Sequence, residues 1–229
     1  MNLIPIPNNY RIYQSFLICF FFFLAMLPQG LFLLDIYIIP LHPDANLYSH
    51  MAIVEALNNG DQNYGYSYAY LRNLDLGIAP ISSMSHGHLY QFFIKILSYG
   101  KVDVKSLYNS IWVIGILNSI LIFFTIFLFS ISLKIGYFKS LYFSLTGCLI
   151  GQLIDFSIRG RPEQAIPFFA CLYSIFHLYF KNINCSLFLI VLGFFIGVVA
   201  SISPLSGAFL ASAFRLLLYI CLKIYCMNI

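Results

Sequence analysis

The amino-acid sequence predicts an all-α, polytopic membrane protein with about six transmembrane helices and a large outer loop. Two observations lead to this fold class. The composition is 61% hydrophobic and only 9% charged, with a mean hydropathy of +0.87, which excludes an ordinary soluble domain. The stretches 12–34 and 112–133 contain no charged residue, and each exceeds the roughly 20 residues that a helix needs to cross a bilayer.

The apolar runs divide one membrane domain, residues 1–229, into spans and connections. We expect the first span to remain in place as a signal anchor and to bend at Pro28, because proline removes a helix hydrogen bond. The predicted spans cover residues 13–39, 107–133, 138–158, 162–180, 186–200 and 204–225. Residues 40–106 form the outer loop.

The orientation follows from the basic residues in the short connections. Lys134 and Lys139 lie between the second and third spans, and Lys181 lies between the fourth and fifth. Positive residues favour the cytoplasmic side, so the N-terminus is predicted to be cytoplasmic and the long loop outside. The membrane is then a bacterial inner membrane or one of the endoplasmic-reticulum type. Because basic residues are scattered at helix ends, the net charge of +4 does not indicate a nucleic-acid partner.

The long loop carries most of the titratable side chains. Six of the eight acidic residues fall between Asp35 and Asp103, together with four of the five histidines. Apolar residues recur at helical spacing over 47–57 and again over 89–97, which predicts two amphipathic helices on the membrane surface. We therefore expect a functional site in this loop or on the membrane face beneath it.

Three short motifs follow one another in a familiar order. They are His42-Pro43-Asp44-Ala45-Asn46-Leu47-Tyr48, Gly87-His88-Leu89-Tyr90 and Arg159-Gly160-Arg161-Pro162-Glu163. This arrangement resembles the N-terminal module of the GT-C superfamily of membrane glycosyltransferases, which includes protein O-mannosyltransferase-like and aminoarabinose-transferase-like enzymes. The chain departs from the family pattern in three respects. Ala45 stands where a second acid is common, His88 stands where proline is usual, and the family normally has more spans. The expectation is a truncated or split relative, namely the N-terminal portion.

The resemblance implies transfer of a sugar from a polyprenyl-phosphate-linked donor to an acceptor on the outer or lumenal side. It places the catalytic acid at Asp44, which would accept the proton of the acceptor hydroxyl or hold a divalent metal that orients the phosphate. The alternative interpretation of Asp44 is a helix N-cap before the first amphipathic stripe. Asp35 is the second candidate acid, with a boundary anchor as its alternative role.

The carrier phosphate needs cationic or hydrogen-bonding partners. Arg159 and Arg161, beside the start of a predicted helix at Pro162, suit such a headgroup, although interfacial arginines also bind lipid phosphates non-specifically. His86 and His88 are further candidates for contacting the phosphate. No set of residues has the spacing of metal ligands, so no metal site is predicted, and there is no nucleotide-binding motif.

Asp155 is an acid inside an otherwise apolar span, which is costly and marks function by default. Arg159 follows one helical turn later, and this order of acid and base favours an ion pair. Structural neutralisation of Asp155 by Arg159 is the simpler interpretation.

Two other classes of function remain open. The chain could be a non-catalytic membrane subunit or an inactive N-terminal fragment, which would imply a partner subunit or a missing C-terminal part. It could also be a transporter or flippase of a lipid-linked or anionic solute, with Asp155 and Arg215 lining a polar path. The concentration of charge at one face, without an internal repeat, favours an interfacial enzyme over a transporter.

Overall fold

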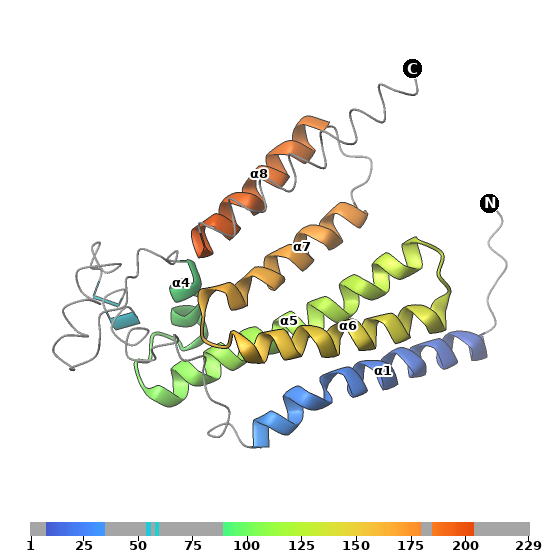
Figure 1. Cartoon of the computed structure of the whole chain (residues 1–229), viewed down its shortest axis with the longest axis horizontal. Coiled ribbons are helices and arrows are strands. Elements are labelled where there is room, and N and C mark those ends of the chain that lie inside the picture. The colour runs from blue at the N-terminus through green and yellow to red at the C-terminus, as the bar shows by residue number, and fades with distance from the viewer. Residues whose placement is uncertain (1–7, 35–53, 56–57, 60–88, 180–184, 204–229) are drawn as a thin grey trace.

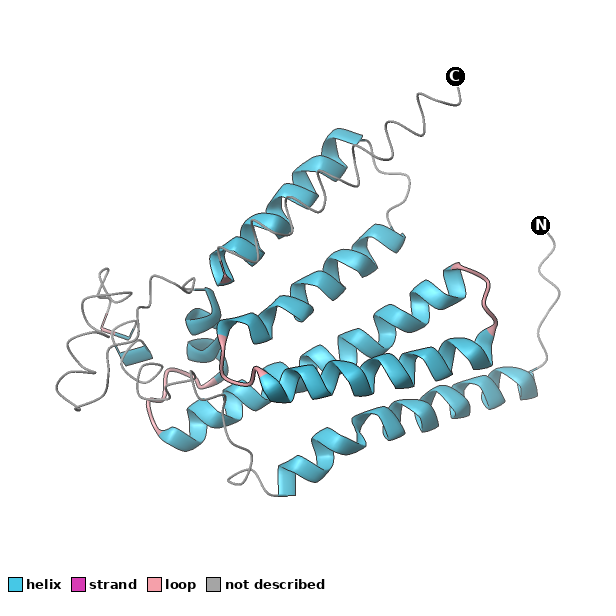
Figure 2. Cartoon of the chain, in the orientation of Figure 1, coloured by secondary structure: helices cyan, strands magenta, loops and turns pink. Residues whose placement is uncertain are grey.

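The computed structural model describes residues 8–34, 54–55, 58–59, 89–179 and 185–203. Every regular element in these residues is a helix (Figure 2), which confirms the predicted all-α class. The elements are α1 (Asn8–Leu34), α4 (Leu89–Leu97), α5 (Val104–Ser132), α6 (Tyr137–Ser157), the 3₁₀ helix η3 (Pro162–Ala165), α7 (Ile166–Tyr179) and α8 (Cys185–Ile202).

Helix α5 is the centre of the bundle, because it packs against α1, α6 and α7. A short turn that ends at Gly136 joins it to α6, so the two helices are antiparallel neighbours (Figure 1). Gly147 and Gly151 allow a close approach, since a Cβ at Gly151 would lie 2.8 Å from Ile122 and one at Gly147 would collide with Ile126. Small residues at this spacing are typical of packed membrane helices.

Two described helical stretches, Arg11–Leu31 and Val104–Ser132, are long and apolar enough to cross a membrane. Helices α6 and α8 coincide with the ranges predicted for the third and fifth spans, and the range 162–180 is divided between η3 and α7. Whether these further helices cross a bilayer stays a prediction. The predicted sixth span, 204–225, lies outside the described residues. Helix α1 continues through Pro28 to Leu34.

Helix α6 has its polar face inside and its apolar face outside. Its buried residues are Ser140, Leu141, Ser144, Cys148, Gln152 and Asp155. Its exposed residues include Tyr142, Phe143, Leu149, Ile150, Leu153 and Ile154. A water-exposed helix has the opposite pattern, whereas a helix that faces lipid turns its polar groups toward the bundle. The hydroxyls of Ser140 and Ser144 donate to the carbonyls four residues earlier, so neither is left unpaired.

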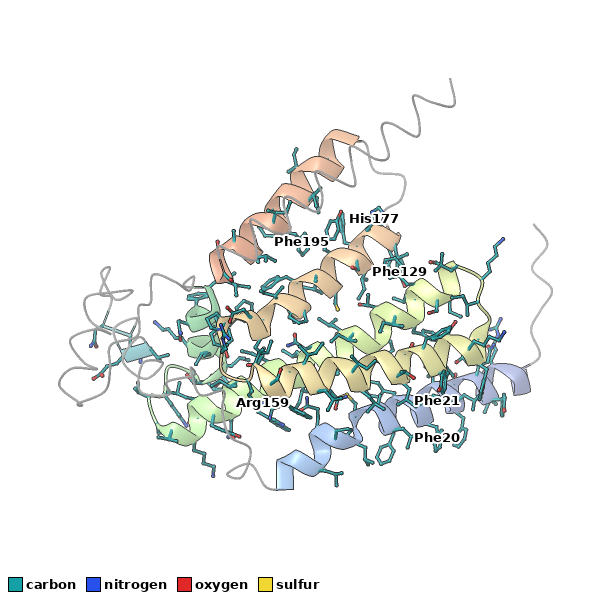
Figure 3. The ribbon with its side chains drawn as sticks, viewed as in Figure 1. Phe20, Phe21, Phe129, Arg159, His177 and Phe195 are labelled. Atoms are coloured by element: carbon teal, nitrogen blue, oxygen red, sulfur yellow. The ribbon has the colours of Figure 1, made fainter. Side chains whose placement is uncertain are left out.

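The interior has three levels along the bundle axis. One apolar cluster lies at the α4 end and includes Val54, Tyr90, Ile94, Leu107, Ile111, Ile114, Ala165 and Ile202. A second lies between α1, α5 and α6 and includes Phe21, Ala25, Phe123, Phe127, Leu141 and Cys148. A group of buried polar residues lies between the two apolar clusters and comes from α1, α5, α6, the residues just after α6, and η3. This group is here called the polar layer and consists of Gln29, Asn118, Ser119, Gln152, Asp155, Arg159 and Gln164. Figure 3 shows Arg159 near the α4 end and Phe21 farther along the bundle.

The outer-loop residues that are described belong to the α4 end of the bundle. The amphipathic stripe predicted over 89–97 is confirmed as a helix, α4. Its last turn passes into Gly100, whose φ of +71° is the left-handed conformation that commonly ends helices. The side-chain amide of Asn58 donates to the Gly100 carbonyl at 2.6 Å. Of the other predicted surface helix, only residues 54–55 are described, and they are helical.

Candidate functional site

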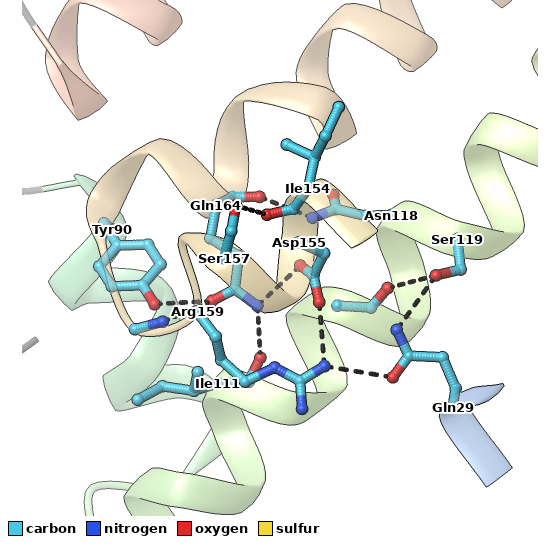
Figure 4. Close-up of polar contacts among 12 residues, drawn as sticks. Gln29, Tyr90, Ile111, Asn118, Ser119, Ile154, Asp155, Ser157, Arg159 and Gln164 are labelled. Carbon is cyan, nitrogen blue, oxygen red and sulfur yellow. Dashed lines mark hydrogen bonds and ion pairs between the residues drawn. The ribbon is translucent and has the colours of Figure 1, made fainter. Parts of the chain in front are cut away.

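The polar layer is organised around an ion pair at the end of α6. Nη2 of Arg159 lies 3.0 Å from Oδ2 of Asp155, and the two side chains are 0% and 4% exposed. Asp155 is in the last turn of α6, and Arg159 follows its end. The spacing of four residues, about one helical turn, brings the two side chains to the same side of the helix end. Figure 4 shows the pair at the junction of α6, α5 and α1.

Gln29 connects the ion pair to α1. Its Oε1 accepts a hydrogen bond from Nη2 of Arg159 at 3.3 Å, and its Nε2 donates to Oγ of Ser119 on α5 at 3.3 Å. The Ser119 hydroxyl donates in turn to the carbonyl of Gly115 at 2.9 Å. Asp155 lies close to α5 at Gly115, because a Cβ there would lie 2.5 Å from Oδ2 of Asp155.

Gln164, in η3, connects the ion pair to α4 and α5. Its Nε2 donates to Oδ1 of Asp155 at 2.9 Å and to the carbonyl of Ile111 at 3.1 Å. Its Oε1 accepts from the hydroxyl of Tyr90 at 3.0 Å. Its backbone carbonyl accepts from Nδ2 of Asn118 at 2.6 Å. Both carboxylate oxygens of Asp155 therefore accept hydrogen bonds from fixed donors.

Two nitrogen atoms of the Arg159 guanidinium lack a close hydrogen-bond acceptor. Nε and Nη1 are buried and have no hydrogen-bond partner among the described residues. One face of the group lies over the ring of Phe156, 4.7 Å from its centroid, and Tyr108 of α5 interacts with the guanidinium through its charge and through a side-chain hydrogen bond. Buried N–H groups without an acceptor are costly. They are also the groups that an anionic oxygen would bind with a charge-assisted hydrogen bond.

Arg161 lies at the edge of the layer. Its Nε is 3.3 Å from Oε2 of Glu163, and the two side chains are 30% and 26% exposed. Its Nη2 donates to Oε1 of the same carboxylate at 3.4 Å. The two arginines therefore differ: Arg159 is enclosed, whereas Arg161 remains partly accessible at the same end of the bundle.

Tyr90 of α4 is the other titratable group in contact with this network. Complete burial raises the pKa of the Tyr90 hydroxyl well above its ordinary value, and the negative charge of Asp155 raises it further. The hydroxyl thus keeps its proton at any physiological pH. It is accordingly fixed as the donor in its hydrogen bond to Gln164.

The structure separates the predicted site residues into two groups. The ion pair between Asp155 and Arg159 is confirmed. Arg161 lies at the same end of the bundle, whereas Asp35, Asp44, His86 and His88 lie outside the described residues. Their roles as base or phosphate ligands stay predictions. Arg159 itself is more deeply buried than the headgroup-binding role would suggest, since its side chain is enclosed by α1, α5 and α6.

The uncharged members of the polar layer were not predicted from the sequence. Gln29, Asn118 and Gln164 are at most 2% exposed, and they supply most of the hydrogen bonds to the ion pair and its neighbours. The sequence nevertheless indicated that such residues are buried and paired, because a side-chain amide in a long apolar run must find a hydrogen-bond partner just as a charge must. Gln152 also lies four residues after Cys148 and three before Asp155, which continues the buried stripe of α6.

The described residues contain no group of three or more His, Cys, Asp or Glu side chains placed to hold a metal ion. Searches of protein-family models, of curated proteins and of solved structures found no match to this chain. The resemblance to GT-C glycosyltransferases therefore rests on the sequence motifs alone, and its functional consequences are proposals.

Proposed function

We propose that the chain is an integral membrane protein whose long helices cross a bilayer, with the N-terminus cytoplasmic and the outer loop on the opposite side. The two helices of sufficient length and hydropathy support this. The reversed polarity of α6 supports it independently, because large apolar side chains such as Tyr142, Leu149 and Leu153 are exposed while the polar stripe is buried. In water this arrangement would be unfavourable, whereas in lipid it keeps the polar stripe of α6 inside the bundle, where it finds partners.

Within this membrane protein, we propose transfer of a sugar from a polyprenyl-phosphate carrier. The observation that carries the proposal is a pair of arginines at one end of the bundle: Arg161, which is 30% exposed and can meet a headgroup, and the buried Arg159 guanidinium behind it. The carrier phosphate leaves as an anion during transfer. Arginine N–H groups in a low-dielectric environment would stabilise that developing charge and lower the barrier.

The proposed proton acceptor is Asp44, on the resemblance alone. When the acceptor hydroxyl attacks the anomeric carbon, the bond from that carbon to the phosphate oxygen breaks. The hydroxyl proton passes to the carboxylate, and the electron pair leaves with the phosphate. A divalent metal held by the outer loop would serve the same phosphate.

The charge balance of the site limits how a phosphate would bind. Arg159 is already paired with Asp155, and Arg161 with Glu163. The two arginine charges are therefore balanced by two carboxylate charges, and these four residues give the site no excess positive charge. A headgroup would therefore bind through arginine N–H groups rather than to a cation that lacks a carboxylate partner. It would also compete with Glu163 for Arg161, where partial exposure makes the pair weak.

A non-catalytic membrane subunit is the second candidate function. It is favoured by the same charge balance, because two complete arginine–carboxylate pairs also describe a purely structural connection between helices. In this case the polar layer would fix the register of α1, α5 and α6, and no carrier lipid would bind there.

The experiment that separates the two candidates uses the full chain, purified in lipid nanodiscs. Radiolabelled polyprenyl-phosphate mannose and polyprenyl-phosphate aminoarabinose serve as donors, solubilised membrane lipids and protein from cells that express the chain supply acceptor hydroxyls, and release of polyprenyl phosphate is measured. The transferase predicts release that is lost in Asp44→Ala and reduced in Arg161→Gln. It predicts no change in Lys139→Gln, which removes an exposed basic residue at the opposite end of α6.

Full release in Asp44→Ala would overturn the assignment of that residue as the base. Absence of both binding and release with either donor would refute the transferase and leave the subunit as the better description.

A further inference from the structure

Gln164 makes contacts that a residue with only a packing role would not need. Its side chain is fully buried, and it touches four separate segments through hydrogen bonds. Nε2 donates to Asp155 and to the carbonyl of Ile111, while Oε1 accepts from Tyr90 and from the backbone N–H of Gly160 at 3.3 Å. All the hydrogen-bonding capacity of the amide is used.

The partners also determine which way the amide points. Nε2 faces two acceptors, the Asp155 carboxylate and a carbonyl oxygen, whereas Oε1 faces two donors, a hydroxyl and an N–H. Rotating the amide by half a turn would oppose donor to donor and acceptor to acceptor. Gln164 therefore presents an N–H to Asp155 and holds Oδ1, which leaves Oδ2 for Arg159.

Tyr90 extends this connection to the outer loop. It is the second residue of α4, is fully buried, and its hydroxyl is held in the protonated state by burial and by Asp155. Helix α4 packs on α5, α8 and η3. The chain of contacts thus runs from α4 through Tyr90, Gln164 and Asp155 to the Arg159 guanidinium, without a break, as Figure 4 shows.

We infer that Tyr90 and Gln164 are positioning residues: docking of outer-loop helix α4 sets the orientation of the Arg159 guanidinium through the Asp155 carboxylate. The hydroxyl is the informative group, because a phenylalanine would fill the same space without it. The role assigned to Arg159 as a phosphate ligand rests on the proposed function, whereas the positioning of its guanidinium does not.

The test measures the guanidinium directly. In the full chain in nanodiscs with isotope-labelled arginine, hydrogen exchange of the Arg159 N–H groups is followed by NMR, and the signal is assigned by its loss in Arg159→Lys. Tyr90→Phe is expected to accelerate exchange at Arg159 roughly three- to tenfold, the factor that one net hydrogen bond carries. Gln164→Glu is expected to act more strongly, because it replaces the donor to Asp155 with a second carboxylate.

Two controls are matched to this change. Tyr99→Phe removes the same hydroxyl from a residue just after α4 that is 90% exposed, and it should leave the exchange rate of Arg159 unchanged. The signal of Arg161 in the same spectra should not respond to Tyr90→Phe. If exchange at Arg159 is the same in Tyr90→Phe and Gln164→Glu as in the unmodified chain, the positioning role is refuted.

A second measurement connects the inference to binding, with undecaprenyl phosphate as the probe. Tyr90→Phe should weaken its binding roughly three- to tenfold, and should cause no further loss in an Arg159→Gln background, because its effect passes through Arg159. An equal loss in both backgrounds would refute that route. If the unmodified chain binds no undecaprenyl phosphate while exchange at Arg159 still accelerates, the proposed function fails and the positioning role stands.

Discussion

Two arginine–carboxylate pairs lie on either side of Gly160, one inside the polar layer and one at its edge. In the Asp155–Arg159 pair both side chains are almost fully buried, whereas in the Arg161–Glu163 pair about a quarter to a third of each side chain is exposed. Two further hydrogen bonds hold the buried pair: Gln29 accepts one from Arg159, and Gln164 donates one to Asp155.

The difference in burial means that the two ion pairs contribute differently to the stability of the bundle. Water screens a partly exposed pair, so its net contribution to stability is small. A buried pair gives up hydration, and its attraction offsets that loss only when the remaining lone pairs and protons are also satisfied. The carboxylate of Asp155 meets this condition, and the guanidinium of Arg159 meets it on one side only.

The largest expected effect comes from breaking the buried pair on one side. Asp155→Leu leaves the Arg159 charge enclosed without its carboxylate, and we expect a loss of about 3–5 kcal/mol in unfolding free energy. The matched change at the edge, Glu163→Leu, should cost about 0–1 kcal/mol. Unfolding by sodium dodecyl sulfate in mixed micelles, followed by circular dichroism, measures both.

The double variant Asp155→Leu/Arg159→Met is the control for this prediction. Removing both charges together should restore most of the lost stability, because the penalty arises from the unpaired charge and not from the missing attraction. Equal losses in Asp155→Leu and Glu163→Leu would mean that the layer is hydrated in the membrane, and would contradict the comparison.

The all-α class was predictable because long uncharged apolar runs favour helices, and these runs are visible in the sequence. Helices α5 and α6 begin and end within a few residues of the predicted ranges. Helix α1 was predicted to start at residue 13 but begins at Asn8, because the uncharged apolar run that indicated the span begins only after Arg11. The 3₁₀ turn η3 was not anticipated, since Pro162 fits the first turn of either helix type.

The candidate site was predictable only in its charged part. The spacing from Asp155 to Arg159 is local, so it was sufficient to predict their ion pair. The partners Gln29 and Gln164 come from segments far away in the sequence, and no local pattern indicates which amide meets which charge. The burial of Arg159 follows from the packing of α1 against α5 and α6, which spacing alone does not determine.

A second prediction tests how tightly the layer is packed around Asp155. Gly115→Ala would place a methyl group 2.5 Å from Oδ2, the oxygen that binds Arg159. The carboxylate has to move, and we expect a loss of about 1–3 kcal/mol. Gly193→Ala on α8, where nothing lies within 4 Å of the added Cβ, should be neutral or stabilising by up to about 1 kcal/mol. The same unfolding titration compares the two variants.

A loss in Gly115→Ala without any in Gly193→Ala would confirm that α5 and α6 approach too closely at Asp155 to admit a methyl group. If both variants unfold at the same point, the carboxylate has room to move. The polar layer would then be looser than the distances indicate.

The smallest expected effect concerns Asp103, an exposed carboxylate that contrasts with Asp155. Asp103 caps the N-terminus of α5, and its Oδ1 accepts from the backbone N–H of Ser106 at 2.9 Å. Hydrogen bonds from the side chain and backbone of Ser106 lower the pKa of Asp103. Because the folded-state pKa lies below the unfolded one, the stabilisation is present above about pH 4 and is lost as the pH falls further through the folded-state value.

Asp103→Asn separates the charge from the cap, because asparagine also caps helices but does not titrate in this range. The unmodified chain should therefore have a slightly higher melting temperature than the variant near neutral pH, and the difference should shrink below about pH 4. Thermal unfolding of both proteins at a series of pH values gives this difference directly. A difference that stays constant with pH would mean that the carboxylate acts only as a hydrogen-bond acceptor, as an uncharged oxygen would.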